Sequence, residues 1–169
     1  EAVLRAFGYW ERNTREEHAE VREILEAALA RGPGHSDCLA ELSLIYWAEY
    51  AFGYNVRPDS LGRARAAAQR AVASAPTSHF AHSALATALF FQKDFQAFRA
   101  AADRALALNR MDSSTAALLG TMIGSAGDWE HGLEVVERAK QLNPHHPGWY
   151  HYLAFDDAYH KRDYRGALA

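Results

Sequence analysis

Gln92-Lys93-Asp94-Phe95 recurs 34 residues later as Ala126-Gly127-Asp128-Trp129. Both stretches place an aspartate directly before an aromatic residue. Aspartate is favoured at helix N-caps, where its carboxylate accepts hydrogen bonds from backbone amides that have no partner within the helix. Each stretch therefore predicts the turn of a helical hairpin, with the second helix starting at the aromatic residue.

The same period marks the ends of the helical units. Pro76, Arg110 and Pro144 follow one another at intervals of 34 residues, and Ala105 recurs as Ala139. Proline blocks continued helix. A bundle of four generic amphipathic helices is the alternative, but it does not account for a fixed period. We predict helices at 2–12, 15–31, 36–51, 60–74, 78–92, 95–109, 113–126, 129–142 and 147–161, and a further one that begins at 164.

These residues resemble the tetratricopeptide-repeat (TPR) family, whose units of about 34 residues are helix–turn–helix hairpins. Leu85-Ala86 and Leu119-Gly120 match the signature of the family's first helix. The resemblance implies an all-α fold, a right-handed α-solenoid superhelix of antiparallel helix pairs. Phe98 and Gly132 stand where the family has alanine, and we expect them to loosen the local packing.

The 169 residues are interpreted as a single domain of such repeats, 1–169. Pro33 and Pro76 are 43 residues apart, and we assign the surplus to a loop around Phe52–Asp59, where Asp59 or Ser60 can cap the next helix. Near the start, Thr14-Arg15-Glu16-Glu17 is typical of a capping box. The expected units are a degenerate one at 1–33, one with an expanded loop at 34–76, regular ones at 77–110 and 111–144, and an incomplete one at 145–169.

Composition narrows the classes of partner. The net charge is −3 and no basic stripe occurs, so we expect no nucleic-acid binding by this segment. No apolar run approaches the roughly 20 residues of a membrane span. A single cysteine, Cys38, allows no internal disulfide and fits a cytoplasmic protein. The sequence starts without methionine and ends inside a helical pattern, so we expect it to be a piece of a longer protein.

Alignment to the family also implies which side chains line the concave groove, where TPR proteins hold extended or helical peptides. The first helix of each hairpin lines that groove. The candidates for partner binding are Leu44, Trp47, Phe80, Ser83, Thr87, Phe90, Phe91, Thr121, His151 and Phe155. The alternative for the aromatic members is that they pack between repeats.

One well-known partner class is excluded by these positions. Chaperone-binding TPR domains resemble one another in a clamp of lysine, asparagine and arginine that holds a C-terminal carboxylate. The matching positions here carry no positive charge: Ala40, Glu41, Leu44, Ala84, Ser114 and Leu118.

We expect no metal site, cofactor or catalytic centre. His79 and His82 are one helical turn apart and His145-His146 lies near His151, but no cysteine or carboxylate partner stands at a recognised spacing. The neighbouring acids Asp156-Asp157 point about 100° apart on a helix, so they do not form a facing dyad. The sequence contains no phosphate loop, nucleophile elbow or dinucleotide fingerprint.

The function predicted is a non-catalytic protein–protein interaction scaffold that binds a peptide or partner protein in the groove. The loops 143–152 and 54–59 look like those of TPR segments in large bacterial signalling and regulatory proteins, which implies a regulatory segment beside a nucleotide-cyclase-like or winged-helix domain. Two alternatives stay open. One is self-association as a homodimer through an apolar helix face bearing Tyr159, Tyr164 and Leu168, and the other is small-molecule sensing by the aromatic groove.

Overall fold

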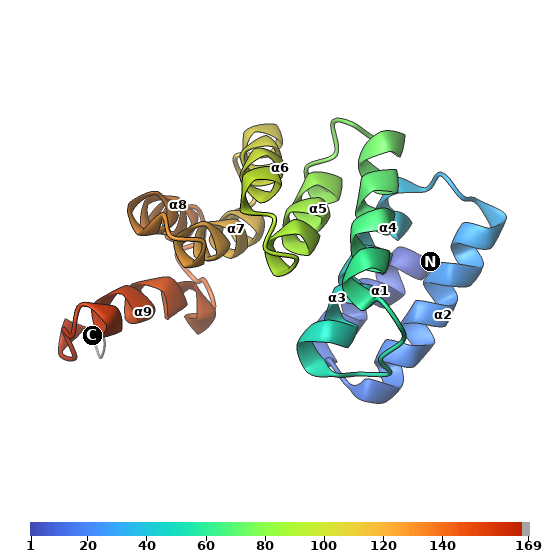
Figure 1. Ribbon diagram of the computed structural model, residues 1–169, viewed down its shortest axis with the longest axis horizontal. Helices are drawn as coiled ribbons and strands as arrows, with labels where there is room; N and C mark the ends of the chain where they lie inside the picture. Colours follow the sequence, from blue (N-terminus) through green and yellow to red (C-terminus); the bar gives the residue numbers. More distant parts are fainter. Residues whose placement is uncertain (167–169) are drawn as a thin grey trace. The chain divides into compact units, whose positions relative to one another are not determined.

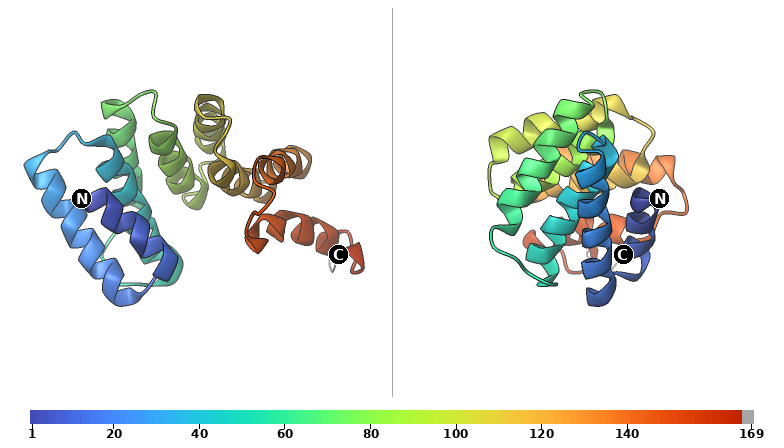
Figure 2. Two further views of the ribbon diagram at one scale, coloured as in Figure 1. Left: turned by 180° about the vertical axis from the view of Figure 1, so that it is seen from behind. Right: turned by 90° about the vertical axis from the view of Figure 1, so that its right-hand side faces the viewer.

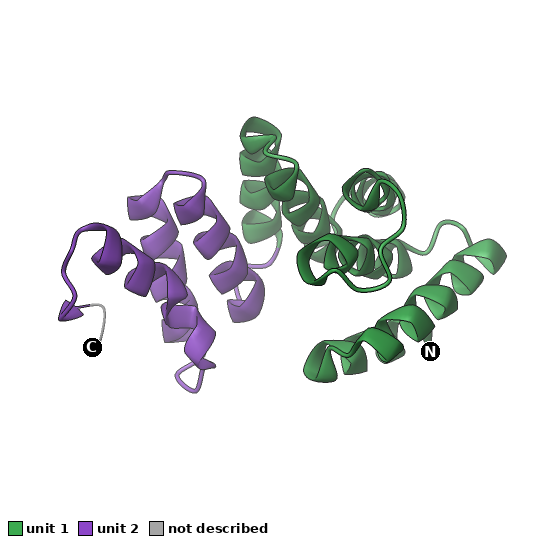
Figure 3. Ribbon diagram, turned by 60° about the horizontal axis from the view of Figure 1, so that its bottom comes forward, with its two compact units in different colours: residues 1–108 green, residues 109–169 purple. Residues whose placement is uncertain are grey.

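The computed structural model describes residues 1–166, and these fold into α-helices without any strand (Figure 1). Contacts group the chain into two compact units, residues 1–108 and residues 109 onward (Figure 3). The first unit holds α1 (Ala2–Arg12), α2 (Arg15–Arg31), α3 (Ser36–Phe52), α4 (Ser60–Ser74), α5 (His79–Phe91) and α6 (Phe95–Leu108). The second holds α7 (Ser113–Ser125), α8 (Trp129–Leu142), the 3-10 turn η1 (Gly148–His151) and α9 (Tyr152–His160).

The helices predicted from the 34-residue period are confirmed, most of them to within a residue at each end. One difference lies after Pro147, where a 3-10 turn precedes α9 in place of one continuous helix. Proline has no backbone N–H and fixes its φ angle, so it suits the tight entry to this turn. The predicted helix from 164 and the apolar residue Leu168 extend into residues 167–169, which lie outside the described residues.

In the hairpins α5–α6 and α7–α8, a left-handed residue followed by a capping aspartate joins the two helices. Lys93 has a φ of 61° and Asp94 then accepts a hydrogen bond from the Ala97 amide at 3.3 Å. Gly127 and Asp128 repeat this arrangement at the start of α8. Asn13 is a further left-handed residue and precedes Thr14, the N-cap of α2. The predicted N-caps are thus confirmed, Thr14 and Asp59 included.

The first helices of the hairpins in unit 1 are neighbours. Each hairpin pairs a first helix with a second, α1 with α2, α3 with α4, and α5 with α6. In addition α3 contacts both α1 and α5, so these three first helices lie next to one another (Figures 1 and 2). Side chains on one face of α1, α3 and α5 can therefore form a continuous surface.

Gly132 and Phe98 do not loosen the packing, and this expectation was wrong. A Cβ atom on Gly132 would lie 2.6 Å from the Gly120 carbonyl oxygen and 2.6 Å from the Gly124 amide nitrogen. The missing side chain lets the backbones of α7 and α8 approach directly. Phe98 is fully buried and its ring packs edge-on against Phe90, with 5.3 Å between centroids. Gly132 and Phe98 are therefore both closely packed, although neither is the alanine typical of the family.

The expanded loop between α3 and α4 is held by a buried carboxylate, that of Glu49. Its oxygens accept hydrogen bonds from Arg22 of α2 at 2.8 Å and from the Ser60 hydroxyl at 2.8 Å. They also accept from the Arg57 amide at 3.1 Å and from the Arg63 guanidinium. Burial alone would raise the pKa of Glu49, but these donors outweigh burial and lower it. The carboxylate therefore stays ionised and ties the loop to α2 and α4.

Asn55 fixes the other side of this loop. Its side-chain amide donates to the Arg15 carbonyl oxygen at 2.7 Å, and its own carbonyl accepts from Arg22 at 2.8 Å. The loop consequently lies against the N-terminal half of α2 (Figures 1 and 2). A shallow depression of about 570 Å³ remains beside it, lined by Glu49, Tyr50, Gly53, Val56, Arg57, Pro58, Asp59, Ser60 and Leu61.

Candidate binding surface

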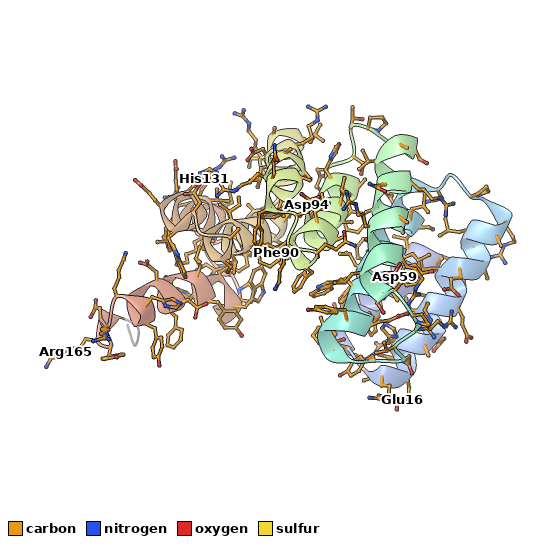
Figure 4. All side chains as sticks on the ribbon, viewed as in Figure 1. Glu16, Asp59, Phe90, Asp94, His131 and Arg165 are labelled. Carbon is orange, nitrogen blue, oxygen red and sulfur yellow. The ribbon has the colours of Figure 1, made fainter. Side chains whose placement is uncertain are left out.

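A row of aromatic rings crosses the three first helices of unit 1, and we call it the aromatic row: Trp10 of α1, Trp47 of α3, and Phe90 and Phe91 of α5. The ring centroids of Trp10 and Trp47 are 6.3 Å apart, and those of Trp47 and Phe91 are 5.4 Å apart. Phe91 and Phe90 follow at 5.2 Å. Every ring in the row is partly exposed. Figure 4 labels Phe90, which lies at the C-terminal end of α5.

Two more exposed rings border the row. Tyr50 is 56% exposed and Phe52 41%. The Tyr50 ring contacts Phe91 at 6.0 Å between centroids, and the Phe52 ring contacts Trp47 at 5.7 Å. Rings that are partly packed and partly open supply apolar contact area at small conformational cost, which is why aromatic residues dominate binding hot spots.

The register of the hairpins explains why the rings meet. Trp10 precedes the left-handed residue Asn13 by three positions, and Phe90 precedes Lys93 by three. Equivalent positions on neighbouring first helices face the same way, so Trp10 and Phe90 point to one surface. The sequence analysis missed Trp10, Tyr50 and Phe52. The spacing of Trp10 from Asn13-Thr14 was the signal that could have found the first of them.

The remaining unit 1 candidates differ in what they can offer. Phe80 is partly exposed, and its ring lies 6.3 Å from that of Phe7 in α1. Leu44 is half-buried. Ser83 is only 6% exposed and Thr87 2%, and the Thr87 hydroxyl donates back to the Ser83 carbonyl oxygen at 3.0 Å. The side chains of Ser83 and Thr87 therefore present little area to a partner.

Three further candidates belong to unit 2. The Thr121 hydroxyl donates to the Ala117 carbonyl oxygen within α7 at 2.9 Å. His151 is exposed, and its ring lies 5.0 Å from that of His146. Phe155 is exposed on α9 and stacks on Tyr159 at 6.1 Å. Within unit 2 these residues do not form one cluster of rings as in the aromatic row.

A buried carboxyl group lies beneath the aromatic row. Glu41 of α3 is 1% exposed, and its Oε2 accepts a hydrogen bond from the Trp10 indole at 3.1 Å. Its Oε1, like the indole nitrogen of Trp47, is buried and has no hydrogen-bond partner among residues 1–166. Burial raises the pKa of Glu41 to about 7, and the nearby Asp37 charge adds to the rise. The Glu41 carboxyl group therefore titrates near neutral pH.

The raised pKa makes stability depend on pH. Folded Glu41 binds its proton more tightly than unfolded Glu41, so the free energy of unfolding falls as pH rises from the ordinary pKa of 4.5 to about 7. The fall is at most about 3 kcal/mol for a shift of this size. Glu41→Gln keeps an acceptor for Trp10 but cannot ionise.

We expect the Glu41→Gln chain to lack this fall and to be the more stable protein above neutral pH. Urea unfolding at acidic and at mildly alkaline pH measures the free energy of unfolding of the parent chain and of Glu41→Gln. Subtracting one pH dependence from the other cancels the contributions of all other ionisable groups. Glu11→Gln, an exposed acid on α1, serves as the control and keeps the dependence of the parent chain. Equal pH dependence in all three proteins would show that Glu41 ionises normally.

No other chemistry gathers on the described part of the chain. Across residues 1–166, no three His, Cys, Asp or Glu side chains are placed to hold a metal ion together. Cys38 is a buried free thiol whose pKa is raised, chiefly by burial. Among the described helices, none has the length and apolarity to cross a membrane.

The comparisons with known proteins bear on the fold. No protein-family model matches this sequence, and no curated protein does. Solved structures do match. TTC0263, a thermophilic TPR protein of Thermus thermophilus, has a TM-score of 0.71 and 18% identity over 97% of this chain and 78% of its own. PilF of Pseudomonas aeruginosa has a TM-score of 0.71 and 20% identity over 99% of this chain and 70% of its own.

A third similar structure is YrrB, described as a TPR protein with an unusual peptide-binding site. Its TM-score is 0.61, with 16% identity over 96% of this chain and 77% of its own. At such identities the likeness concerns the backbone, and it agrees with the hairpins, caps and turns described above. This chain has the tetratricopeptide-repeat fold.

Proposed function

We propose that unit 1 binds a peptide or a segment of a partner protein on the aromatic row. The observation that carries this proposal is the continuity of Trp10, Trp47, Phe91 and Phe90 across three helices, with every ring partly exposed. Monomeric proteins rarely expose contiguous apolar surface without a binding role. The description of the similar protein YrrB as peptide-binding supports the same interpretation.

A peptide ligand obtained by selection provides the test. Random dodecapeptides displayed on phage are selected on the whole chain, and the dissociation constants of the selected peptides are measured by fluorescence anisotropy. We expect Trp47→Ala to weaken binding by at least about thirty-fold, because loss of a central aromatic anchor costs about 2 kcal/mol or more.

A second variant separates binding from folding, since Trp47 is half-buried. Tyr50→Ser removes an exposed ring at the border of the row and leaves the core untouched. It should weaken binding several-fold with an unchanged circular dichroism spectrum. Tyr152→Ser, which removes an exposed tyrosine of unit 2, is the matched control and should bind normally. If no peptide is selected, or if all three variants bind alike, the aromatic row is not the binding site.

We also propose self-association through α9, on a separate observation. Tyr152, Phe155 and Tyr159 of α9 and Tyr164 beyond it are all exposed. A contiguous patch of exposed apolar side chains promotes association. Sedimentation velocity over a wide concentration range should show a dimer that Phe155→Ser together with Tyr159→Ser abolishes. A monomer at every concentration would exclude this role.

A further inference from the structure

We propose that the segment bound by the aromatic row carries a basic side chain, lysine or arginine, which lies over Trp10 and pairs with the exposed Asp37. This inference rests on the proposed function and names the chemical class of the ligand. It follows from the charges around the row and from the contacts of Trp10.

The charges left on the first helices are acidic. Both arginines of α1 are already in ion pairs with glutamates of α2, Arg5 with Glu20 at 3.8 Å and Arg12 with Glu17 at 2.5 Å. Glu49 of α3 is likewise neutralised by arginines. Histidine aside, α5 has no ionisable charge.

Three Asp, Glu, Lys or Arg side chains on these helices have no ion pair among the described residues: the exposed Glu11 and Asp37, and the buried Glu41, whose pKa of about 7 leaves it partly protonated near neutral pH. All three are acids. A partner with positive charge gains from this field, and a partner with negative charge is repelled.

The acids of α3 lie beside one end of the row. Glu41 accepts a hydrogen bond from the Trp10 indole, so its carboxylate is in contact with the edge of that ring. Asp37 is one helical turn earlier, close enough for its charge to raise the pKa of Glu41, and it is exposed. The buried acid and the indole ring are thus in contact, and the exposed acid lies one helical turn away on α3.

This combination fits a cationic side chain. A guanidinium or ammonium group over a tryptophan ring gains about 0.5–2 kcal/mol, and tryptophan is the best ring for this contact. The exposed Asp37 can pair directly with the cation. The buried Glu41 does not touch the ligand, but its carboxylate, when ionised, adds negative charge beside the Trp10 ring. The other end of the row, Phe90 and Phe91 on α5, has no acid on its own helix and is left for apolar side chains of the same segment.

The same phage selection tests this inference, with charge as the variable. Random dodecapeptides are selected in parallel on the parent chain and on Asp37→Lys. We expect peptides from the parent chain to contain more Lys and Arg than Asp and Glu. Their affinity should fall about five-fold on Asp37→Asn and more on Asp37→Lys. Peptides selected on Asp37→Lys should contain no more Lys and Arg than Asp and Glu.

A matched control separates a local contact from net charge. Glu23→Lys reverses an exposed acid on α2, away from the row, and should leave the affinity unchanged. Circular dichroism verifies that each variant is folded. Selected peptides that are neutral or acidic, or that bind Asp37→Asn as tightly as the parent chain, would overturn the basic preference while the aromatic row remained a binding site. A selection that yields no peptide at all would overturn both.

Discussion

Replacement of Glu49 by alanine is expected to lower the free energy of unfolding by about 3–5 kcal/mol, the usual cost of removing one partner of a buried ion pair. Glu49 has no exposed surface, and the Arg22 side chain that pairs with it is 6% exposed. Without the carboxylate, Arg22 remains as a buried charge whose one acceptor among the described residues is the Asn55 carbonyl oxygen. The Ser60 hydroxyl and the Arg57 amide lose an acceptor at the same time.

Urea unfolding followed by circular dichroism measures this loss. Hydrogen exchange should show that residues 53–60 lose their protection first, since Glu49 ties that loop to α2. Glu20→Ala is the matched control, because it breaks the exposed pair with Arg5 and should cost no more than about 1 kcal/mol. If the two variants lose equal stability, the buried network does not hold the loop.

The second large effect is expected from Gly132→Ala. Alanine is the better helix former by about 1 kcal/mol, so a free helical site would become more stable. At Gly132 the added Cβ would instead meet the backbone of α7 at 2.6 Å, and backbone cannot move aside as a side chain can. Overpacking of a close interface costs about 1–3 kcal/mol and sometimes more. We therefore expect a net destabilisation of about 2 kcal/mol, with the sign opposite to helix propensity.

The control for this prediction lies in the same unit. A Cβ on Gly148 meets nothing within 4 Å, so Gly148→Ala should change the free energy of unfolding by less than about 0.5 kcal/mol. Thermal unfolding of both variants beside the parent chain gives the comparison. A Gly132→Ala protein as stable as the parent chain would mean that α7 and α8 are not in direct backbone contact.

The helices and their caps could be predicted because their determinants are local. Asp94 and Asp128 mark the starts of α6 and α8 within a few residues of sequence, and proline and the 34-residue period mark the ends. The chemistry of a cap needs no knowledge of distant segments.

The candidate site was only partly predictable because exposure is a tertiary property. Ser83 and Thr87 occupy the helix positions that the family resemblance implies for the groove, yet neighbouring helices bury them. Trp10 was missed because its helix belongs to an irregular first unit, and only the contact between α1 and α3 brings it to Trp47.

Two other features needed the fold for the same reason. The Glu49 network joins α2, α3 and the start of α4, and no sequence spacing links Arg22 with Glu49. Gly132 looked like a defect in the repeat until its distance to Gly120 and Gly124 was known. Long-range pairings of this kind depend on how the hairpins stack.

The most direct test of the central proposal uses the four tryptophans as reporters. Trp10 and Trp47 belong to the aromatic row, whereas Trp129 and Trp149 lie in unit 2. Each indole N–H gives its own resonance in a ¹⁵N–¹H correlation spectrum, assigned by single tryptophan-to-phenylalanine substitutions. On titration with a selected peptide we expect the Trp10 and Trp47 indole signals to shift together, while those of Trp129 and Trp149 stay in place. Shifts confined to Trp129 and Trp149, with Trp10 and Trp47 unmoved, would contradict the assignment of binding to the aromatic row.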